Sequence, residues 1–209
     1  MSKVTAHLIA SKPVALTGGM GSGKSSVARF WKQQFGIDYI DADQVCRDLL
    51  TTGASGWKIF VATFGNEFLA ENRSIDRQKL RDAIFVDHKL RRRLDKLIHP
   101  LARDEIKNML TGIEPARCLV EVPLLYEAGW EKDFSSIVVV SATDECCLDR
   151  LIERDQITRE AAKQAIATQL TLSEKANRAD YVIDNSGTWQ DTCLQLLSLG
   201  DILWRKGVA

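Results

Sequence analysis

The sequence predicts an α/β fold in which helices cover both faces of a five-stranded parallel sheet, so that the protein has three layers. Short apolar segments alternate with helical patterns along most of the chain, as in a sheet assembled from β–α–β units. A glycine-rich loop also joins the first of these segments to a helix, at the sheet edge where such folds bind ligands. The five expected strands are residues 13–16, 39–41, 118–122, 136–140 and 181–183.

The loop after the first strand carries the pattern G-x-x-x-x-G-K-[ST] at Gly18, Gly23, Lys24 and Ser25. This pattern, between a strand and an amphipathic helix, is typical of a phosphate-binding P-loop. Glycines let backbone N–H groups curl around an anion, and the following helix points the positive end of its dipole at the same place. We therefore expect a P-loop NTPase sandwich that binds a nucleoside triphosphate. Lys24 is expected at the β- and γ-phosphates, with the Ser25 hydroxyl on Mg²⁺.

The stretch after the second strand is much longer than one crossover needs, since it extends from Asp43 to about Pro115. Its pattern is helical, and Pro100 lies where one helix is expected to end and another to begin. A helical insertion at this edge of the sheet is well placed to bind a second substrate, and extra scaffold is the alternative. The apolar stripe of the insertion is Leu90, Leu94, Leu97, Ile98 and Leu101.

A second insertion, residues 149–178, follows the fourth strand and is dense in arginine and lysine. Two helices are expected in it, separated near residues 155–158. In phosphotransferases a mobile lid brings cations over the transferred phosphoryl group, whereas a solvated pair of charged helices is the alternative. We therefore divide the chain into a nucleotide-binding core (1–43, 116–148 and 179–209), a helical acceptor domain (44–115) and a lid (149–178).

The last helix is expected to begin at Thr188, where Thr188 and Asp191 form a capping pair. Leu194, Leu197 and Trp204 then recur at helical spacing, which is typical of an apolar helix face.

The composition is that of an ordinary globular protein. The 209 residues are 45% hydrophobic and 27% charged, and a formal net charge of zero with a pI of about 6.8 does not indicate a nucleic-acid-binding surface.

No apolar run approaches the ~20 residues of a membrane span, and residues 1–19 lack a continuous signal-peptide core. The cysteines show no C-x-x-C spacing, which disfavours disulfides or structural zinc and favours a reducing cytoplasm. They are Cys46, Cys118, Cys146, Cys147 and Cys193.

Acidic residues follow the second and third strands, on the ligand side of the sheet. Asp41 and Asp43 could accept a hydroxyl proton or bind Mg²⁺, whereas an Asx-turn, or a cap by Asp43 on a helix from Gln44, is the structural alternative. Glu121 could hold Mg²⁺ through water. Glu127 could line an acceptor cleft or face solvent.

Six segments, taken together and in this order, resemble the dephospho-coenzyme A kinase family over about residues 14–187. The segments are ALTGGMGSGKSSV, IDADQVCRDLL, IHPLAR, EVPLLYEAGW, RDQITRE and ADYVIDNSG. The P-loop alone is generic, but the other segments at these separations are specific to this family of P-loop kinases of the nucleoside-monophosphate-kinase-like class. The resemblance implies phosphorylation of the ribose 3′-hydroxyl of dephospho-coenzyme A by ATP and Mg²⁺, the last step of coenzyme A biosynthesis.

The resemblance also implies roles for individual residues. Asp43 becomes the catalytic base, Lys24 the phosphate-stabilising lysine, Ser25 a magnesium ligand, and Arg150 or Arg154 the cation of the lid. A single histidine beside a proline is typical of a structural hydrogen bond, yet the resemblance brings His99 near the coenzyme. The residues expected at ATP are Gly19, Met20, Gly21, Ser22, Gly23, Lys24, Ser25, Ser26 and Asn185, the last in the region that meets adenine. Those expected at dephospho-coenzyme A are Asp43, His99, Pro123 and Leu124.

The chain departs from the family pattern at two positions. Members often carry aspartate where this chain has Glu121, which leaves its contact with the metal or its water open. Many also have an arginine where this chain has Ala165, so that three arginines compete as the lid cation. We favour Arg150 and Arg154, which lie four residues apart on one helical face, and expect Arg159 on the surface.

Two other functions remain as alternatives. A P-loop kinase for a nucleoside monophosphate or another small metabolite would share the loop and the lid but differ in the acceptor domain. A GTP-driven switch would be expected to carry an N/T-K-x-D motif after a later strand, and the sequence has none. The expected partners are small molecules, without nucleic acid or membrane, and the expected state is a monomer or a weak homo-oligomer.

Overall fold

A computed structural model of the chain describes residues 12–204, apart from the side chain of Phe85. Residues 1–11, part of the stretch in which the sequence predicts no signal peptide, lie outside the described residues. The chain forms two compact units, one made of the residues up to Ile40 and from Ile113 onward and the other of Asp41–Gly112. The assignments of residues 44–115 as an acceptor domain and 149–178 as a lid remain predictions. Within the described part, no helix is both long enough and apolar enough to cross a membrane.

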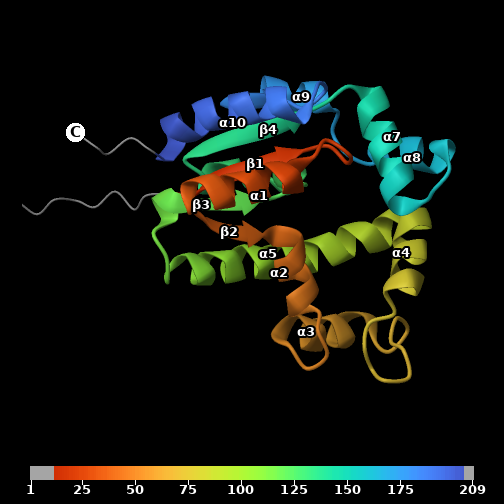
Figure 1. The fold of residues 1–209 in the computed structure, drawn as a ribbon. Helices are drawn as coiled ribbons and strands as arrows, with labels where there is room; N and C mark the ends of the chain where they lie inside the picture. The colour runs from red at the N-terminus through yellow and green to blue at the C-terminus, as the bar shows by residue number, and fades with distance from the viewer. Residues whose placement is uncertain (1–11, 205–209) are drawn as a thin grey trace, which may run out of the picture. The chain divides into compact units, whose positions relative to one another are not determined.

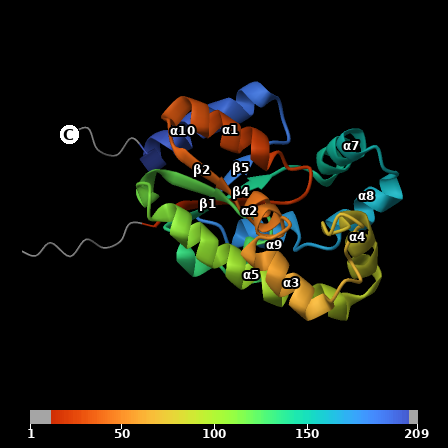
Figure 2. The ribbon, with the colours of Figure 1, turned by 90° about the horizontal axis from the view of Figure 1, so that it is seen from below.

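The first unit is built on a five-stranded sheet with the order β2-β3-β1-β4-β5, and β1 pairs in parallel with β3 and β4, as β4 does with β5 (Figure 1). Figure 2 shows α1 (Lys24–Phe35) and α10 (Trp189–Trp204) on one face of this sheet and α9 (Leu172–Asn177) on the opposite face. The predicted three-layered α/β fold is therefore confirmed. The strands are β1 (Val14–Gly18), β2 (Asp38–Asp41), β3 (Cys118–Glu121), β4 (Ser136–Ser141) and β5 (Tyr181–Asp184), and three short helices are η1 (Pro115–Arg117), α6 (Leu125–Ala128) and η2 (Glu131–Asp133).

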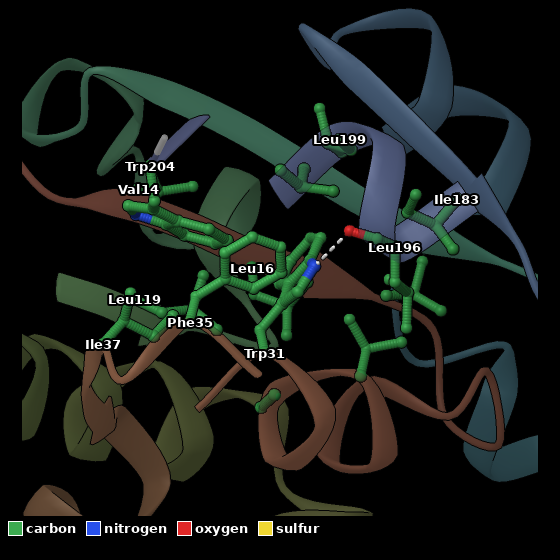
Figure 3. Close-up of a cluster of buried hydrophobic side chains, with 14 residues drawn as sticks. Val14, Leu16, Trp31, Phe35, Ile37, Leu119, Ile183, Leu196, Leu199 and Trp204 are labelled. Atoms are coloured by element: carbon green, nitrogen blue, oxygen red, sulfur yellow. Dashed lines mark hydrogen bonds between the residues drawn. The ribbon is translucent and has the colours of Figure 1, made fainter. Parts of the chain in front are cut away.

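The core between the sheet and its two long helices is centred on Trp31 of α1 (Figure 3). The indole N–H of Trp31 donates to the carbonyl oxygen of Leu196 at 2.8 Å, so this fully buried ring leaves no polar atom without a partner. The rings of Trp31 and Trp204 also meet edge to face, with centroids 5.1 Å apart. These contacts hold α1, the helix that begins at the P-loop, against α10.

The buried face of α10 includes Trp204 of the predicted apolar face, whereas Leu194 and Leu197 are 61% and 37% exposed. The helix carries leucines on several sides, so their spacing alone does not identify the face that packs. Gly200 does identify it, because a Cβ at this position would lie 2.3 Å from the ring of Phe35. The buried residues of α10 are Thr192, Leu196, Leu199, Gly200 and Trp204.

Residues 149–178 contain one helix more than predicted. The expected break is confirmed: α7 (Asp144–Asp155) ends at Gln156, whose backbone is left-handed, and α8 (Arg159–Ile166) begins after its cap Thr158. The third helix, α9, has only six residues, which is too short to show a helical repeat of apolar residues. The pattern T-x-x-E at residues 171–174, which forms a capping box, does mark its start. The predicted cap of α10 is also confirmed, since the Thr188 hydroxyl donates to the Asp191 carboxylate at 2.6 Å.

The second unit is helical, as predicted, and has a core of its own formed by Phe60, Phe68, Ile75 and Leu80. Its helices are α2 (Ala42–Leu49), α3 (Ser55–Phe64), α4 (Arg77–Val86) and α5 (His88–Leu110).

Pro100 lies inside α5 and does not separate two helices, which corrects the prediction. A proline removes one helical hydrogen bond, but Pro100 is exposed, where water can bond to the carbonyl that the helix leaves unpaired. The buried side chains of Ile98, Ala102 and Ile106 continue the packed face across this position. Tertiary packing therefore outweighs the local preference of proline.

Replacing Gly200 with alanine should destabilise the first unit, because the new methyl group would enter the space of the Phe35 ring. Overpacking of this kind costs roughly 1–3 kcal/mol. Thermal unfolding followed by circular dichroism measures the loss, and Ser198→Ala, on the exposed side of the same helix, is the control. An unchanged melting temperature in Gly200→Ala would mean that α10 can move away from Phe35 without cost.

Candidate active site

The glycine loop between β1 and α1 packs closely against other segments of the chain. Gly21 and Gly23 have positive φ angles of 74° and 96°, which glycine adopts without strain. A Cβ at Gly21 would lie 2.3 Å from the carbonyl oxygen of Cys147 in α7, and one at Gly23 would lie 2.2 Å from the side-chain nitrogen of Asn185. The loop can therefore hold this shape only with glycine at these positions.

Lys24, the first residue of α1, folds back over the loop. Its ammonium group donates to the carbonyl oxygens of Gly19 at 2.8 Å and Gly18 at 3.3 Å. The side chain thus lies at the place where the helix N-terminus and the glycine loop meet. A lysine, a helix dipole and a glycine loop together can bind the phosphates of a nucleotide.

A buried carboxylate lies beside the first turn of α1. Glu121, at the end of β3, is 5% exposed and accepts a hydrogen bond from the Ser25 hydroxyl at 3.4 Å and from the Tyr39 hydroxyl at 2.7 Å. A hydroxyl and a carboxylate are hard oxygen ligands, and Mg²⁺ is typically bound by one or two such groups together with substrate phosphates. The donor set of Ser25 and Glu121 therefore fits Mg²⁺ or its bound water. Among the described residues, no three His, Cys, Asp or Glu side chains gather as a larger metal cage.

Asn185, in the region expected at adenine, braces the loop with a buried side chain. Its amide N–H donates to the carbonyl oxygen of Ser22 at 2.8 Å, and its amide oxygen accepts from the Thr192 hydroxyl at 3.0 Å. Because Asn185 is only 5% exposed, its amide is committed to these partners. Its near neighbour Gly187 is exposed.

Only one of the three candidate lid arginines touches the loop. Arg150 of α7 donates to the carbonyl oxygens of Asn185 at 2.8 Å and Gly21 at 3.5 Å. Arg154 points elsewhere: its guanidinium makes two hydrogen bonds to the Asp155 carboxylate, and its side chain is 64% exposed.

Arg159, at the start of α8, forms ion pairs with Glu145 and Asp149 of α7. Hydrogen bonding to Arg159 lowers the pKa of the Glu145 carboxyl below its usual value. Arg159 therefore ties α8 to α7 at the protein surface.

The turn after β3 is pinned by a lysine that the sequence analysis missed. Lys175 of α9 donates to the carbonyl oxygen of Pro123 at 2.9 Å and pairs with the Glu127 carboxylate at 3.0 Å. Glu127 also accepts the N–H of Leu170 at 3.0 Å, so it is hydrogen-bonded within the protein while part of the residue still faces solvent. Leu124 follows Pro123 in this turn and is half-buried. No sequence pattern marks a helical lysine as buried.

In the second unit, the cap of α2 is Asp41 and not Asp43. One Asp41 carboxylate oxygen accepts the N–H groups of Asp43 at 2.9 Å and Gln44 at 3.1 Å, because the helix begins at Ala42. The alternative in which Asp43 caps a helix from Gln44 is therefore wrong. Asp43 lies exposed in the first turn, and its charge adds to burial in raising the pKa of the Cys46 thiol to about 11.

His99 lies on α5 of the same unit, with its Nε2 3.9 Å from an Asp95 carboxylate oxygen. Its side chain is 27% exposed. It is therefore partly accessible on the helical unit, as Asp43 is.

A family model described as dephospho-CoA kinase matches residues 13–191 of the chain. A dephospho-CoA kinase from Arabidopsis thaliana is 40% identical over 183 residues, covering 85% of this chain and 78% of that protein. One from Bacillus licheniformis is 38% identical over 191 residues, covering 90% and 94%. The crystal structure of TT1252 from Thermus thermophilus is similar in fold, with a TM-score of 0.80 at 26% identity over 92% of this chain and 98% of that one.

Replacing Asn185 with aspartate is expected to loosen the loop, because a carboxylate would face the Ser22 carbonyl oxygen to which the amide now donates. The lost bond and the repulsion cost roughly 1–3 kcal/mol. We expect a lower melting temperature and weaker binding of a fluorescent ATP analogue, whereas Asn66→Asp, in an exposed turn, should change neither. If folded Asn185→Asp binds the analogue with full affinity, the loop does not depend on this hydrogen bond.

Proposed function

The chain belongs to the dephospho-CoA kinase family, and we propose that it transfers a phosphoryl group from ATP to the ribose 3′-hydroxyl of dephospho-coenzyme A, the final step of coenzyme A biosynthesis. The family match over residues 13–191 supports this reaction. The observation that carries it is the glycine loop between β1 and α1, with Lys24 folded over it. Each residue role below is part of the same proposal.

Lys24 and the loop hold the phosphates of ATP. The ammonium group of Lys24 now rests on the carbonyl oxygens of Gly18 and Gly19, and a rotation of its flexible side chain would bring it to a phosphate at the same loop. Its positive charge and the N-terminal dipole of α1 would stabilise the charge on the transferred group. The segment that follows Asn185 would meet the adenine.

Ser25 and Glu121 hold Mg²⁺ or its water, beside the loop. When bound, the ion neutralises phosphate charge and orients the transferred group. Tyr39 supports this arrangement, because its hydroxyl donates to one carboxylate oxygen of Glu121. The other carboxylate oxygen accepts the hydrogen bond from Ser25. The longer glutamate, where family members often carry aspartate, is thus held in a fixed orientation.

Asp43 accepts the proton of the 3′-hydroxyl. Its carboxylate is exposed in the first turn of α2, and the capping of this helix is already performed by Asp41. The helical unit that carries Asp43 and His99 would hold dephospho-coenzyme A. Helices lined with leucine, isoleucine and phenylalanine suit the long pantetheine arm of this substrate.

Residues 149–178 form the lid, and Arg150 is its first candidate cation. Arg150 already reaches the loop through the carbonyl oxygen of Gly21, whereas Arg154 and Arg159 are engaged with carboxylates. Arg154 would first have to leave Asp155 to approach a phosphate. Arg159 serves the packing of α8 on α7.

The reaction takes place in the cytoplasm, in a monomer or a weak homo-oligomer whose partners are small molecules. All five cysteines are free thiols, which suits a reducing compartment.

Asp43→Asn should lower turnover by ~10²–10⁴ with little change in ATP affinity, because the amide keeps the size of the side chain but cannot accept a proton. Steady-state kinetics and binding of a fluorescent ATP analogue measure the two effects. Asp48→Asn, with its carboxylate on the same helix, is the matched control and should keep wild-type kinetics. Normal turnover in Asp43→Asn would remove Asp43 from the mechanism, and a loss of ATP·Mg²⁺ affinity alone would make it a residue near the metal.

The acceptor itself is tested by ATP consumption with dephospho-coenzyme A, adenosine, AMP and shikimate under identical conditions. Contacts with the pantetheine arm can be used to orient the 3′-hydroxyl, so acceptors that lack the arm should lose turnover as well as affinity. We expect dephospho-coenzyme A to exceed the others in kcat/KM by at least ~10³, which is about 4 kcal/mol in the transition state. Equal use of AMP would overturn this acceptor and leave only a P-loop kinase.

A further inference from the structure

Lys175 is a charged side chain that is fully buried, with 0% exposure. Lysine is almost never buried in this way unless it is paired. Its ammonium group is paired twice, with the Pro123 carbonyl oxygen at 2.9 Å and the Glu127 carboxylate at 3.0 Å. Both partners lie within residues 123–127, the turn after β3 together with the start of α6, so one side chain of α9 holds this turn at two points.

Each partner of Lys175 also has a second donor. The Pro123 carbonyl oxygen accepts the Thr17 hydroxyl at 3.3 Å, and Thr17 is the residue of β1 that precedes the glycine loop. The Glu127 carboxylate accepts the N–H of Leu170 at 3.0 Å, in the connection between α8 and α9. Three segments, the end of β1, the turn after β3 and the start of α9, therefore meet around one buried ammonium group.

The same helix also packs on the glycine loop. A Cβ built on Gly19 would lie 3.2 Å from the Leu172 side chain, so the first residue of α9 covers the loop closely. The capping box of Thr171 and Glu174 fixes the start of this short helix. A displacement of α9 would therefore move both the glycine loop and the turn after β3.

A role in stability alone does not account for this arrangement. Burying the ammonium group of Lys175 costs desolvation, and an apolar side chain of similar volume often stabilises a protein as well or better. The ammonium group also fixes orientation, because its hydrogen bonds determine where the Pro123 carbonyl and the Glu127 carboxylate lie.

We propose that Lys175 is a positioning residue for phosphoryl transfer, which fixes the turn of residues 123–127 relative to the glycine loop through α9. The proposal rests on the proposed function, because Pro123 and Leu124 are the residues of this turn that would meet dephospho-coenzyme A. Lys175 itself is buried and acts only through its partners. Its loss should impair the use of the acceptor while leaving the binding of ATP intact.

The test is Lys175→Met, which keeps the length and volume of the side chain and removes its hydrogen bonds. We expect faster hydrogen exchange in residues 122–128 and 168–176, and a decrease in kcat/KM for dephospho-coenzyme A of about 10- to 100-fold. The dissociation constant of a fluorescent ATP analogue should stay within about twofold, well below the tenfold change that 1.4 kcal/mol would produce. Lys132→Met, which removes an exposed lysine of the same unit, is the matched control and should change none of these quantities.

Two further variants keep the test decisive if Lys175→Met does not fold. Lys175→Met combined with Glu127→Gln leaves no carboxylate without its ion-pair partner and should show the same separation between acceptor use and ATP binding. Thr17→Val removes only the longer bond to the Pro123 carbonyl oxygen and should change acceptor kinetics in the same direction by a smaller factor.

The proposal is overturned if exchange in residues 122–128 is unchanged, or if each folded variant turns over dephospho-coenzyme A as the wild type does. Equal losses for acceptor use and ATP binding would also overturn it, since they indicate a general loosening of the unit. A failure of the proposed function is recognised separately, because the wild-type protein itself would then not phosphorylate dephospho-coenzyme A, and the exchange measurement would still decide whether Lys175 holds the turn.

Discussion

The close approach of other segments of the chain to the glycine loop determines what the first unit can do. At Gly21 the carbonyl of Cys147 occupies the space of a side chain, and at Gly23 the amide of Asn185 does so. α7 and the end of β5, which are distant in the sequence, therefore help to shape the loop. The phosphate-binding geometry is consequently a property of the packed sheet and its helices, and the motif alone would not maintain it.

Two buried charged side chains of this unit fix the orientation of the groups to which they are hydrogen-bonded. Glu121 and Lys175 are both buried. Glu121 is held by partners in α1 and β2, and Lys175 is held by two partners within residues 123–127. Such groups lose their hydration on burial, and only well-aligned hydrogen bonds within the protein compensate for that loss. The burial of apolar side chains around Trp31, by contrast, holds α1 and α10 on the sheet. Stability and orientation are thus provided by different sets of residues.

Local patterns in the sequence were sufficient for the strands, the P-loop and the break between α7 and α8, because each depends on residues that are close in the chain. They could not separate Asp41 from Asp43 as a cap, since both aspartates precede a helical pattern and only the backbone decides where the helix begins. Tyr39 and Lys175 were missed because their partners lie 82 and 52 residues away. The roles of Asp43 and of the lid arginines remain predictions from the family resemblance.

The order of the strands has a consequence for how this architecture can diversify. β2 is an edge strand, and the chain leaves the sheet at its end for residues 41–112 before it returns as β3. An excursion that starts from an edge leaves the pairing of β1 with β3 and β4 untouched, whatever its length. Evolution can therefore exchange or enlarge the helical unit as a module while the nucleotide-binding sheet is inherited unchanged. The same junctions, before Asp41 and after Gly112, are the natural boundaries at which a chimaera with another helical unit would be joined.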